Sequence, residues 1–391
     1  MKPIRILELR SVWGTGGGPE KTILLGTART DPRRFAITVC YLRDRRDPVF
    51  SIDNRAASLP VNYIEVIERH SFDPDIWTQL RRIVRDHQID IVHAHDYKTN
   101  VLAALLQRVE GVAAMSTVHG WTGHSRRERY FYYPLDKYVL GTLRRVVAVS
   151  EDIRQELLKR GADPTRVRTV LNGIDHRAFH RDQTLTAATR RELGLSAEDV
   201  VIGSVGRLEP QKRFDLLIDA VNTLRRREPR LKLVIAGDGS LRADIAAHVT
   251  RLGLSNACRL LGHRDDVTRL HHAFDLYVQS SDYEGTPNSV LEAMAMESPV
   301  IATAAGGTAQ LIRHDIDGVI VPIGGQSAII AAIEHALANP DAAARWAASA
   351  RRRVETDLSF DTRMAMVEAV YLELMALDGR ADDRSAQPLQ V

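Results

Sequence analysis

Short apolar runs alternate with longer segments of helical spacing along most of the chain. In the first half, the runs predict strands at 4–9, 36–41, 89–93, 114–117 and 146–149. After residue 199 they predict strands at 200–205, 231–236, 258–261, 276–279, 299–303 and 318–321. Helical segments such as 19–30 and 77–87 separate the strands, which predicts parallel sheets with helices on both faces. Because the alternation occurs in two series, we predict an α/β fold with two Rossmann-like, doubly wound domains.

The polar segment 172–196 contains no strong strand and joins the two series. We therefore expect an N-terminal domain at residues 1–175 and a C-terminal domain at residues 196–360. After Pro340 the chain has the composition and spacing of helix as far as Leu377, so a terminal helix is expected at 361–378. Residues 379–391 are polar and are expected to form a disordered tail.

Composition is typical of a soluble globular protein: 44% of the 391 residues are hydrophobic and 26% are charged. No apolar run reaches the roughly 18 residues of a membrane span, and the N-terminus is not a signal peptide. Cys40 and Cys258 lie in different halves, which favours a reducing cytoplasm over a disulfide framework.

The charge is unevenly distributed. Residues 1–180 contain 29 Lys and Arg against 21 Asp and Glu, and the remaining residues contain 24 against 29. A basic first half suggests an anionic partner such as a membrane surface or a phosphorylated acceptor, although a solvated Arg-rich surface explains it equally well. No recognised nucleic-acid-binding motif accompanies the charge, so nucleic acid is not expected.

The segment 281–295 is the most informative. It contains Glu284 and Glu292 on either side of a Gly-Thr-Pro-Asn turn. We expect Pro287 at the first helical position with Thr286 as the cap. The backbone N–H groups of residues 288–290 would then point out of the helix start, where an anion is favoured. Two carboxylates beside such a helix end suit a ligand with hydroxyls and a phosphate.

Two cations follow another predicted strand. Arg207 and Lys212 bracket a loop at the carboxyl edge of the second sheet, where open α/β folds bind ligands. They are suited to holding a diphosphate and stabilising its charge as it leaves. Gly237 and the segment 260–264 lie at similar strand ends and are weaker candidates for contacts with a ligand.

The first half carries two further candidates. A glycine-rich turn at 14–18 follows the first strand, but it matches neither the dinucleotide pattern nor the P-loop pattern. His119 follows the strand at 114–117 and is expected to face a ligand. His93 and His95 form a His-x-His pair typical of metal hydrolases, but Lys98 stands where a dinuclear site needs another histidine. We therefore expect no metal site.

Taken in their order along the chain, the motifs resemble those of the retaining nucleotide-sugar glycosyltransferases of family 4. These enzymes have the GT-B fold, with a cleft between two Rossmann-like domains. The resemblance rests on the glycine turn Gly16-Gly17-Gly18, His119-Gly120, Val149-Ser150, Asn172-Gly173-Ile174-Asp175, Gly206-Arg207-Leu208 with Lys212, Gly237-Asp238-Gly239 and the block from Glu284 to Glu292. The last block is the most specific. Pro19 departs from the family pattern, which leaves the contacts of Glu20 and Lys21 open.

The resemblance implies a role for each matching residue. Arg207 and Lys212 would bind the diphosphate, Glu292 the ribose and Glu284 the donor sugar, with His119 near the transferred sugar. The implied catalytic residues are His119, Arg207, Lys212 and Glu284. The implied donor site comprises Gly17, Gly18, Arg207, Lys212, Gly237, His263, Arg264, Glu284, Gly285, Thr286, Pro287, Asn288, Ser289 and Glu292. The final helix would return to the first domain, and catalysis would need no metal or other cofactor.

These features predict a cytoplasmic glycosyltransferase that moves a sugar from a UDP-type or GDP-type donor to a sugar, glycolipid or lipid-linked acceptor. Surface polysaccharide or glycolipid assembly is the expected setting. Segment 121–138 combines Arg126, Arg127 and Arg129 with aromatic residues, and would either rest on an anionic membrane or pack its aromatics in the core. Two alternatives remain: a nucleotide-sugar 2-epimerase of the same fold, and a non-catalytic sugar-nucleotide-binding subunit.

Overall fold

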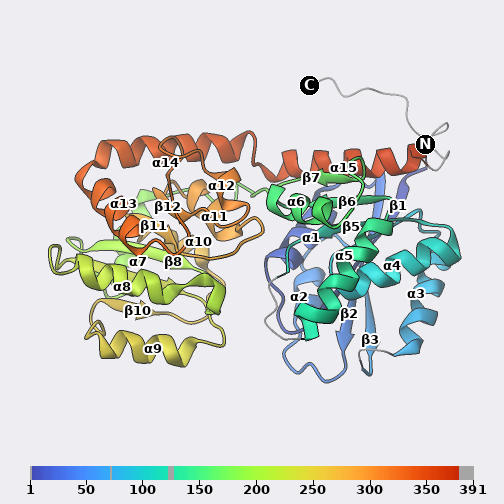
Figure 1. The fold of residues 1–391 in the computed structure, drawn as a ribbon, viewed down its shortest axis with the longest axis horizontal. Coiled ribbons are helices and arrows are strands. Elements are labelled where there is room, and N and C mark those ends of the chain that lie inside the picture. Colours follow the sequence, from blue (N-terminus) through green and yellow to red (C-terminus); the bar gives the residue numbers. More distant parts are fainter. Residues whose placement is uncertain (1, 71–72, 122–126, 378–391) are drawn as a thin grey trace. The chain divides into compact units, whose positions relative to one another are not determined.

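The chain forms two compact units (Figure 1). The computed structural model describes residues 2–70, 73–121 and 127–377. The first unit comprises Met1–Val170 together with Met364–Val391, and the second comprises Leu171–Arg363.

The first unit is built on a seven-stranded parallel sheet. Its strands are β1 (Ile4–Val12), β2 (Phe35–Asp44), β3 (Asn62–Glu68), β4 (Ile91–Ala94), β5 (Ala113–Val118), β6 (Arg145–Ala148) and β7 (Val167–Thr169), in the spatial order β3-β2-β1-β4-β5-β6-β7. Its helices are α1 (Gly18–Arg29), α2 (Ile52–Ala57), α3 (Pro74–Asp86), α4 (Tyr97–Glu110), the π-helix η1 (Glu128–Tyr132), α5 (Tyr133–Thr142) and α6 (Glu151–Lys159). The last helix, α15 (Phe360–Leu377), belongs to this unit from Met364 onward.

The second unit has a six-stranded parallel sheet with the same kind of strand order. Its strands are β8 (Val200–Val205), β9 (Leu231–Ala236), β10 (Cys258–Leu260), β11 (Leu276–Gln279), β12 (Val300–Thr303) and β13 (Val319–Val321), ordered β10-β9-β8-β11-β12-β13. Its helical segments are η2 (Gln183–Leu185), α7 (Thr186–Glu192), η3 (Pro210–Lys212), α8 (Phe214–Leu224), α9 (Arg242–Arg251), α10 (Val267–His271), α11 (Asn288–Ala295), α12 (Thr308–Leu311), α13 (Gln326–Ala338) and α14 (Pro340–Glu355).

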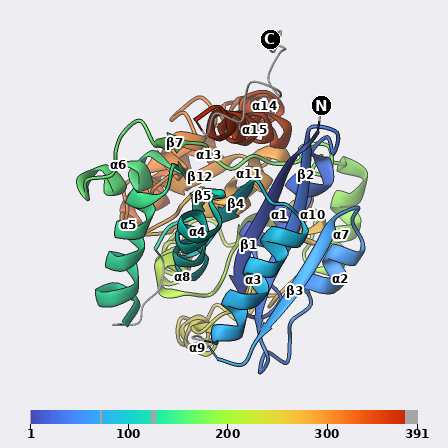
Figure 2. The ribbon, with the colours of Figure 1, turned by 90° about the vertical axis from the view of Figure 1, so that its right-hand side faces the viewer.

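Strand periodicity explains how the first sheet is covered. Successive side chains of a strand point to opposite faces. Ile4 and Ile6 therefore pack on one face with Val370 of α15, whereas Leu7 and Leu9 pack in a separate core on the other face. Figure 2 shows β1 within this sheet, with α15 at the top of the view and α3 in front of the strands. Both faces are covered, which is why the inner strands read as nearly continuous apolar runs.

Both sheets reverse their strand order at one point. In the first sheet the reversal lies between β1 and β4, and in the second it lies between β8 and β11. Open α/β sheets bind ligands beyond the carboxyl ends of the strands at such a switch point. The loops after these four strands are therefore where a site is expected in each unit.

The predicted fold class is confirmed, and each predicted strand corresponds to a strand of the structure. β3 and β7 were not predicted. Both are edge strands; β3 carries polar residues among its apolar ones, and β7 has only three residues. Residues 356–359 separate α14 from α15, because Leu358 O and Phe360 N bond to the backbone of Ile174. These bonds replace the helical ones at that point.

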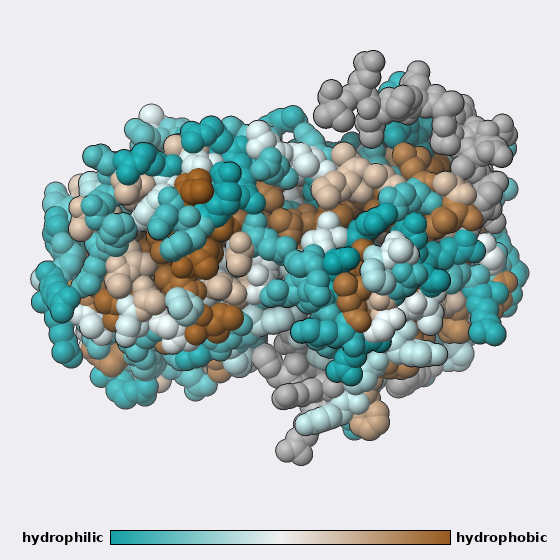
Figure 3. Space-filling view, turned by 45° about the horizontal axis from the view of Figure 1, so that its top comes forward, coloured by the Kyte–Doolittle hydropathy of each residue, from teal (hydrophilic) through white to brown (hydrophobic). Residues whose placement is uncertain are grey.

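Hydrophilic side chains cover most of the face seen in Figure 3, with hydrophobic ones in smaller groups between them. Among the described residues, no helix combines the length and the apolar character needed to cross a membrane.

Candidate active site

In the second unit, the loop after β8 carries the two predicted cations. Arg207 is exposed, and its guanidinium makes no ion pair within the described part of the chain. Lys212 ends the short helix η3 and is half-buried. Gly237, after β9, has a φ of +145°, and a Cβ there would lie 1.8 Å from Gly206 O. Only glycine allows the ends of β8 and β9 to approach this closely.

Glu284 lies just beyond β11 and is buried. Its Oε1 accepts hydrogen bonds from Lys212 Nζ at 2.5 Å, Ser281 Oγ at 2.6 Å and Gln279 Nε2 at 3.1 Å. A buried carboxylate needs such donors to offset the loss of water. The structure thus brings together Lys212 and Glu284, which are 72 positions apart in sequence, as an ion pair at the switch point of the second sheet.

Sequence reasoning assigned no role to the residues that support the Glu284 loop, although Asn172 belonged to a matched motif. Gly306, after β12, has a φ of +52°, and a Cβ there would lie 1.9 Å from Glu284 O. The next residue, Gly307, donates its N–H to Gly285 O at 2.8 Å. Asn172 donates through Nδ2 to Thr286 O at 3.1 Å. The adjacent glycines at 306 and 307 after a strand were an available signal.

Helix α11 begins one residue later than predicted. Pro287 occupies the N-cap position, and no side chain caps the helix, so the prediction of Thr286 as the cap is wrong. Val290 N donates to Pro287 O at 3.2 Å. The predicted set of three outward N–H groups is therefore reduced to those of Asn288 and Ser289 at most. Glu292 is half-buried within the helix.

The strand ends at β9 and β10 are joined through their backbones, since Gly237 N donates to Gly262 O at 2.8 Å. His263 is exposed and lies 3.4 Å from Asp265. The Arg264 guanidinium binds Asp266 and Glu192. The Arg264 side chain is therefore held by these two carboxylates, and a role of His263 or Arg264 in donor binding stays a prediction.

In the first unit, the glycine turn leads directly into α1. Gly17 is the N-cap and Gly18 the first helical residue. The Glu20 carboxylate is buried, accepts the Gly17 N–H at 2.5 Å and pairs with Arg10. The Glu20 contact left open by the sequence is therefore internal, and it holds the turn in shape.

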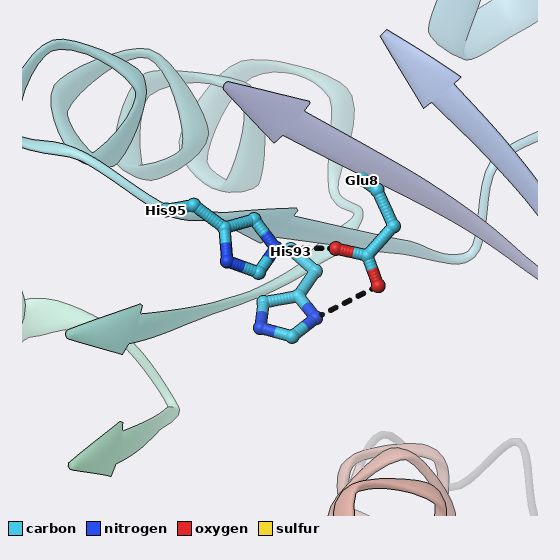
Figure 4. A group of neighbouring side chains, drawn as sticks. All are labelled: Glu8, His93 and His95. Carbon is cyan, nitrogen blue, oxygen red and sulfur yellow. Dashed lines mark hydrogen bonds and ion pairs between the residues drawn. The ribbon is translucent and has the colours of Figure 1, made fainter. Parts of the chain in front are cut away.

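His119 follows β5 and lies at the end of a buried polar cluster. His95 Nδ1 is 3.4 Å from His119 Nε2. Glu8 of β1 contacts His93 Nδ1 at 3.2 Å and forms a short contact with His95 Nε2 (Figure 4). Sequence reasoning identified the two histidines of the His-x-His pair but not Glu8. Glu8, His93 and His95 place potential ligand atoms within 4.8 Å of one another, a set able to approach one metal ion.

The charge state of this cluster follows from its burial and its contacts. Burial raises the pKa of Glu8, but His93 and His95 outweigh it and hold the pKa well below its ordinary value. Burial and the neighbouring His93 lower the pKa of His95 to about 4, although Glu8 acts in the opposite direction. Near neutral pH, Glu8 is therefore ionised and His95 neutral.

The aromatic segment 121–138 places several side chains at the surface. Tyr130, Phe131 and Tyr138 are 66%, 72% and 74% exposed. The alternative in which these aromatics pack in the core is wrong for these three residues. Trp121, by contrast, is held inward by a 2.9 Å hydrogen bond to Asp136. Arg126 lies outside the described residues.

Two family models match the chain. The one described as Glycosyltransferase Family 4 matches residues 16–178, and the one described as Glycosyl transferases group 1 matches residues 186–353. Among curated proteins, EpsD of Bacillus subtilis, which is named as a glycosyltransferase, is 28% identical over 326 residues, or 79% of this chain and 84% of EpsD. The UDP-Gal:alpha-D-GlcNAc-diphosphoundecaprenol alpha-1,3-galactosyltransferase of Escherichia coli is 28% identical over 252 residues, covering 62% of this chain and 65% of that protein.

Solved structures share the whole architecture. Anabaena HepE in complex with UDP-glucose has a TM-score of 0.82 at 20% identity, with 94% of this chain and 99% of that chain covered. Sucrose-phosphate synthase from Thermosynechococcus elongatus has a TM-score of 0.79 at 20% identity, with coverages of 95% and 100%. These similarities show the fold.

The two family models together match most of the chain, one on each sheet, and the strand orders agree with the predicted architecture. The chain belongs to the family 4 glycosyltransferases and has their GT-B fold.

Proposed function

We propose that this glycosyltransferase uses a nucleotide diphosphate sugar as donor and transfers the sugar, with retention of anomeric configuration, to a hydroxyl of a sugar or lipid-linked acceptor. The observation that carries the proposal is the Lys212–Glu284 ion pair at the switch point of the second sheet. A cation at this position is suited to a ligand that brings its own negative charge.

The proposed step breaks the bond between the anomeric carbon and the diphosphate oxygen and forms a bond to the acceptor oxygen, and the proton of the acceptor hydroxyl passes to the departing diphosphate. Negative charge develops on the departing diphosphate. Positive groups placed where that charge develops lower the barrier. Lys212 would exchange its contact with Glu284 for a diphosphate oxygen, and Arg207, which is exposed on the same loop, would add a second cation. Glu284 would then accept a hydrogen bond from a donor-sugar hydroxyl, and Glu292 from the ribose.

The relatives support the donor and acceptor classes. The Escherichia coli relative is named for a UDP-galactose donor and a lipid-diphosphate acceptor, and HepE is solved with UDP-glucose. UDP sugars are therefore the first donors to test and GDP sugars the second. By the same comparison, we propose a role in assembling a surface polysaccharide or glycolipid.

The proposed location is the cytoplasm, with peripheral contact at the membrane. Cys40 and Cys258 are both buried and free and lie in different units, which suits a reducing compartment. The exposed aromatics of η1 and α5 support a membrane contact, because aromatic side chains favour the interface between lipid and water.

The decisive experiment incubates the protein with radiolabelled UDP and GDP sugars, with and without a lipid-linked or sugar acceptor. A glycosyltransferase of this kind labels the acceptor and releases the nucleoside diphosphate. Conversion of the donor to its 2-epimer without an acceptor would instead identify an epimerase, and tight binding with no turnover would identify a binding subunit. The anomeric coupling constant of the product, measured by NMR, tests retention.

A further inference from the structure

A line of buried side chains leads from the first sheet to His119. Glu8 contacts His95, and His95 contacts His119. We propose that Glu8 and His95 are positioning residues for the transfer reaction: they hold the His119 ring in place and locate its proton on Nε2. The inference rests on the proposed transferase function and on the role in transfer that the family resemblance implies for His119.

The strand geometry places these residues on one face. Glu8 is the register partner of His93 across β1 and β4. His95 lies two residues beyond His93, and His119 two residues beyond Thr117. Because side chains two apart in a strand share a face, Glu8, His93 and Thr117 point to the side of the sheet that α15 covers. His95, just beyond β4, joins them through its contact with Glu8, and His119, just beyond β5, through its contact with His95. The line therefore sits at the switch point, where this fold binds ligands.

The hydrogen bonds determine where each proton lies. The Glu8 carboxylate is ionised and can only accept. Tyr371 of α15 donates its hydroxyl proton to Glu8 Oε1 at 2.8 Å, and His95 donates from Nε2 to the other oxygen. A neutral imidazole carries one proton. His95 Nδ1 consequently carries no proton, so it accepts a hydrogen bond from His119 Nε2–H, 3.4 Å away.

The near-parallel planes of the two rings support this arrangement, because an N–H in the plane of one ring can then point at the nitrogen of the other. The His95 and His119 centroids are 5.7 Å apart with an interplanar angle of 26°. A proton on His119 Nε2 that is directed to His95 Nδ1 fixes the orientation of the His119 ring.

His93 offers an internal control. It is buried on the same strand and contacts Glu8 as His95 does. Its own bonds, however, lead away from His119: Nδ1 to Tyr371 Oη at 2.8 Å and Nε2 to Thr117 Oγ1 at 2.7 Å. A purely structural role for the cluster would make His93 and His95 equally important, whereas a positioning role singles out His95.

The test compares Glu8→Gln and His95→Asn with the matched control His93→Gln. Gln at position 8 keeps the shape of Glu8, but its amide offers one acceptor oxygen to the two donors, Tyr371 Oη and His95 Nε2. Asn at position 95 is shorter than histidine and cannot reach Glu8. We expect kcat to fall about tenfold to 100-fold in both variants, as misplaced catalytic groups do, with the affinity for the nucleoside diphosphate within about twofold. For His93→Gln we expect a similar fall in Tm but a kcat within about threefold of the wild type.

A second measurement does not depend on turnover. The ¹⁵N spectrum of histidine-labelled protein reports the tautomer of each ring, and loss of one set of signals in His119→Ala assigns His119. The expected result is the Nε2–H form in the wild type and in His93→Gln, with a mixed or reversed form in Glu8→Gln. If no donor is turned over, the proposed function fails while this measurement still decides the positioning.

Three results would overturn the inference. One is an equal loss of kcat in His93→Gln and His95→Asn, which would make the cluster structural. Another is the Nδ1–H form of His119 in the wild type. The third is one equivalent of tightly bound metal in the purified protein, measured by mass spectrometry, because a metal would occupy the nitrogen that carries the His95 proton.

Discussion

Replacement of Gly306 by alanine should disable the proposed donor site by displacing the backbone of Glu284. Gly306 has a left-handed φ of +52°, which costs any other residue about 1–2 kcal/mol. The added Cβ would also lie 1.9 Å from Glu284 O, well inside van der Waals contact. The Glu284 loop must then move, and a displacement on the order of 1 Å is enough to cost up to about 100-fold in a positioned site.

Gly324 provides the matched control. It also lies in the second unit, with a φ of +71°, but a Cβ there meets nothing within 4 Å. Gly324→Ala should therefore carry only the conformational cost, which lowers Tm by about 2–4 °C per kcal/mol in a domain of this size. Gly306→Ala should lower Tm further, because it adds the displacement of the loop.

The assay is calorimetric titration of UDP or GDP, whichever the donor screen selects, together with thermal unfolding of both variants. We expect nucleotide affinity and kcat to be unchanged in Gly324→Ala and to fall at least about tenfold in Gly306→Ala. Equal nucleotide affinity and equal kcat in the two folded variants would refute the view that Gly306 holds the Glu284 loop.

Three further predictions test separate features. Lys212→Ala should abolish transfer with only a small change in Tm, because it removes a cation proposed to stabilise the departing diphosphate. The control is Lys232→Ala, which alters a lysine 3.8 Å from Asp199 and should leave kcat unchanged. Near-normal turnover in Lys212→Ala would contradict the proposal that Lys212 binds the diphosphate. Burial lowers the pKa of His271 to about 3, so the unfolded chain binds a proton there more readily, and the free energy of unfolding should decline as pH falls from about 6.5 to 3. His271→Phe should flatten that decline in urea titrations, and an unaltered pH slope would contradict the assignment. Replacing the exposed Tyr130 and Phe131 by serine should reduce co-sedimentation with anionic lipid vesicles without changing Tm, and unchanged sedimentation would exclude this membrane contact.

The sequence predicted the structure best where burial requires one kind of residue. Buried parallel strands must be apolar on both faces, so the inner strands were recognisable without any partner in view. Edge strands are half-covered, and β3 was missed because Glu65 and Glu68 interrupt its apolar pattern. The ordered motifs also indicated the family by resemblance, and the structure places Arg207, Lys212 and Glu284 after strands β8 and β11 of one parallel sheet.

The site was predicted as a set of residues but not as a set of contacts. The sequence placed Lys212 and Glu284 in one donor site, yet nothing in their spacing indicated that they bind each other. The close packing of Gly306 against the Glu284 backbone could not be predicted either, because glycine has no side chain whose chemistry indicates a role. The cap of α11 was misplaced by one residue, since Thr286 and Pro287 are both good helix starters and only the backbone geometry chooses between them.

By itself, the sequence determined the two parallel sheets, the family and the residues that follow the central strands, because these depend on local pattern and on the spacing of motifs. The tertiary structure alone decided the line from Glu8 through His95 to His119. Glu8 lies in β1, whereas His95 and His119 lie just beyond β4 and β5, and Tyr371, which contacts Glu8, lies on α15, more than 200 residues later in the chain. Hydrogen bonds between such distant residues depend on strand order and register, which long-range packing sets and no local pattern encodes.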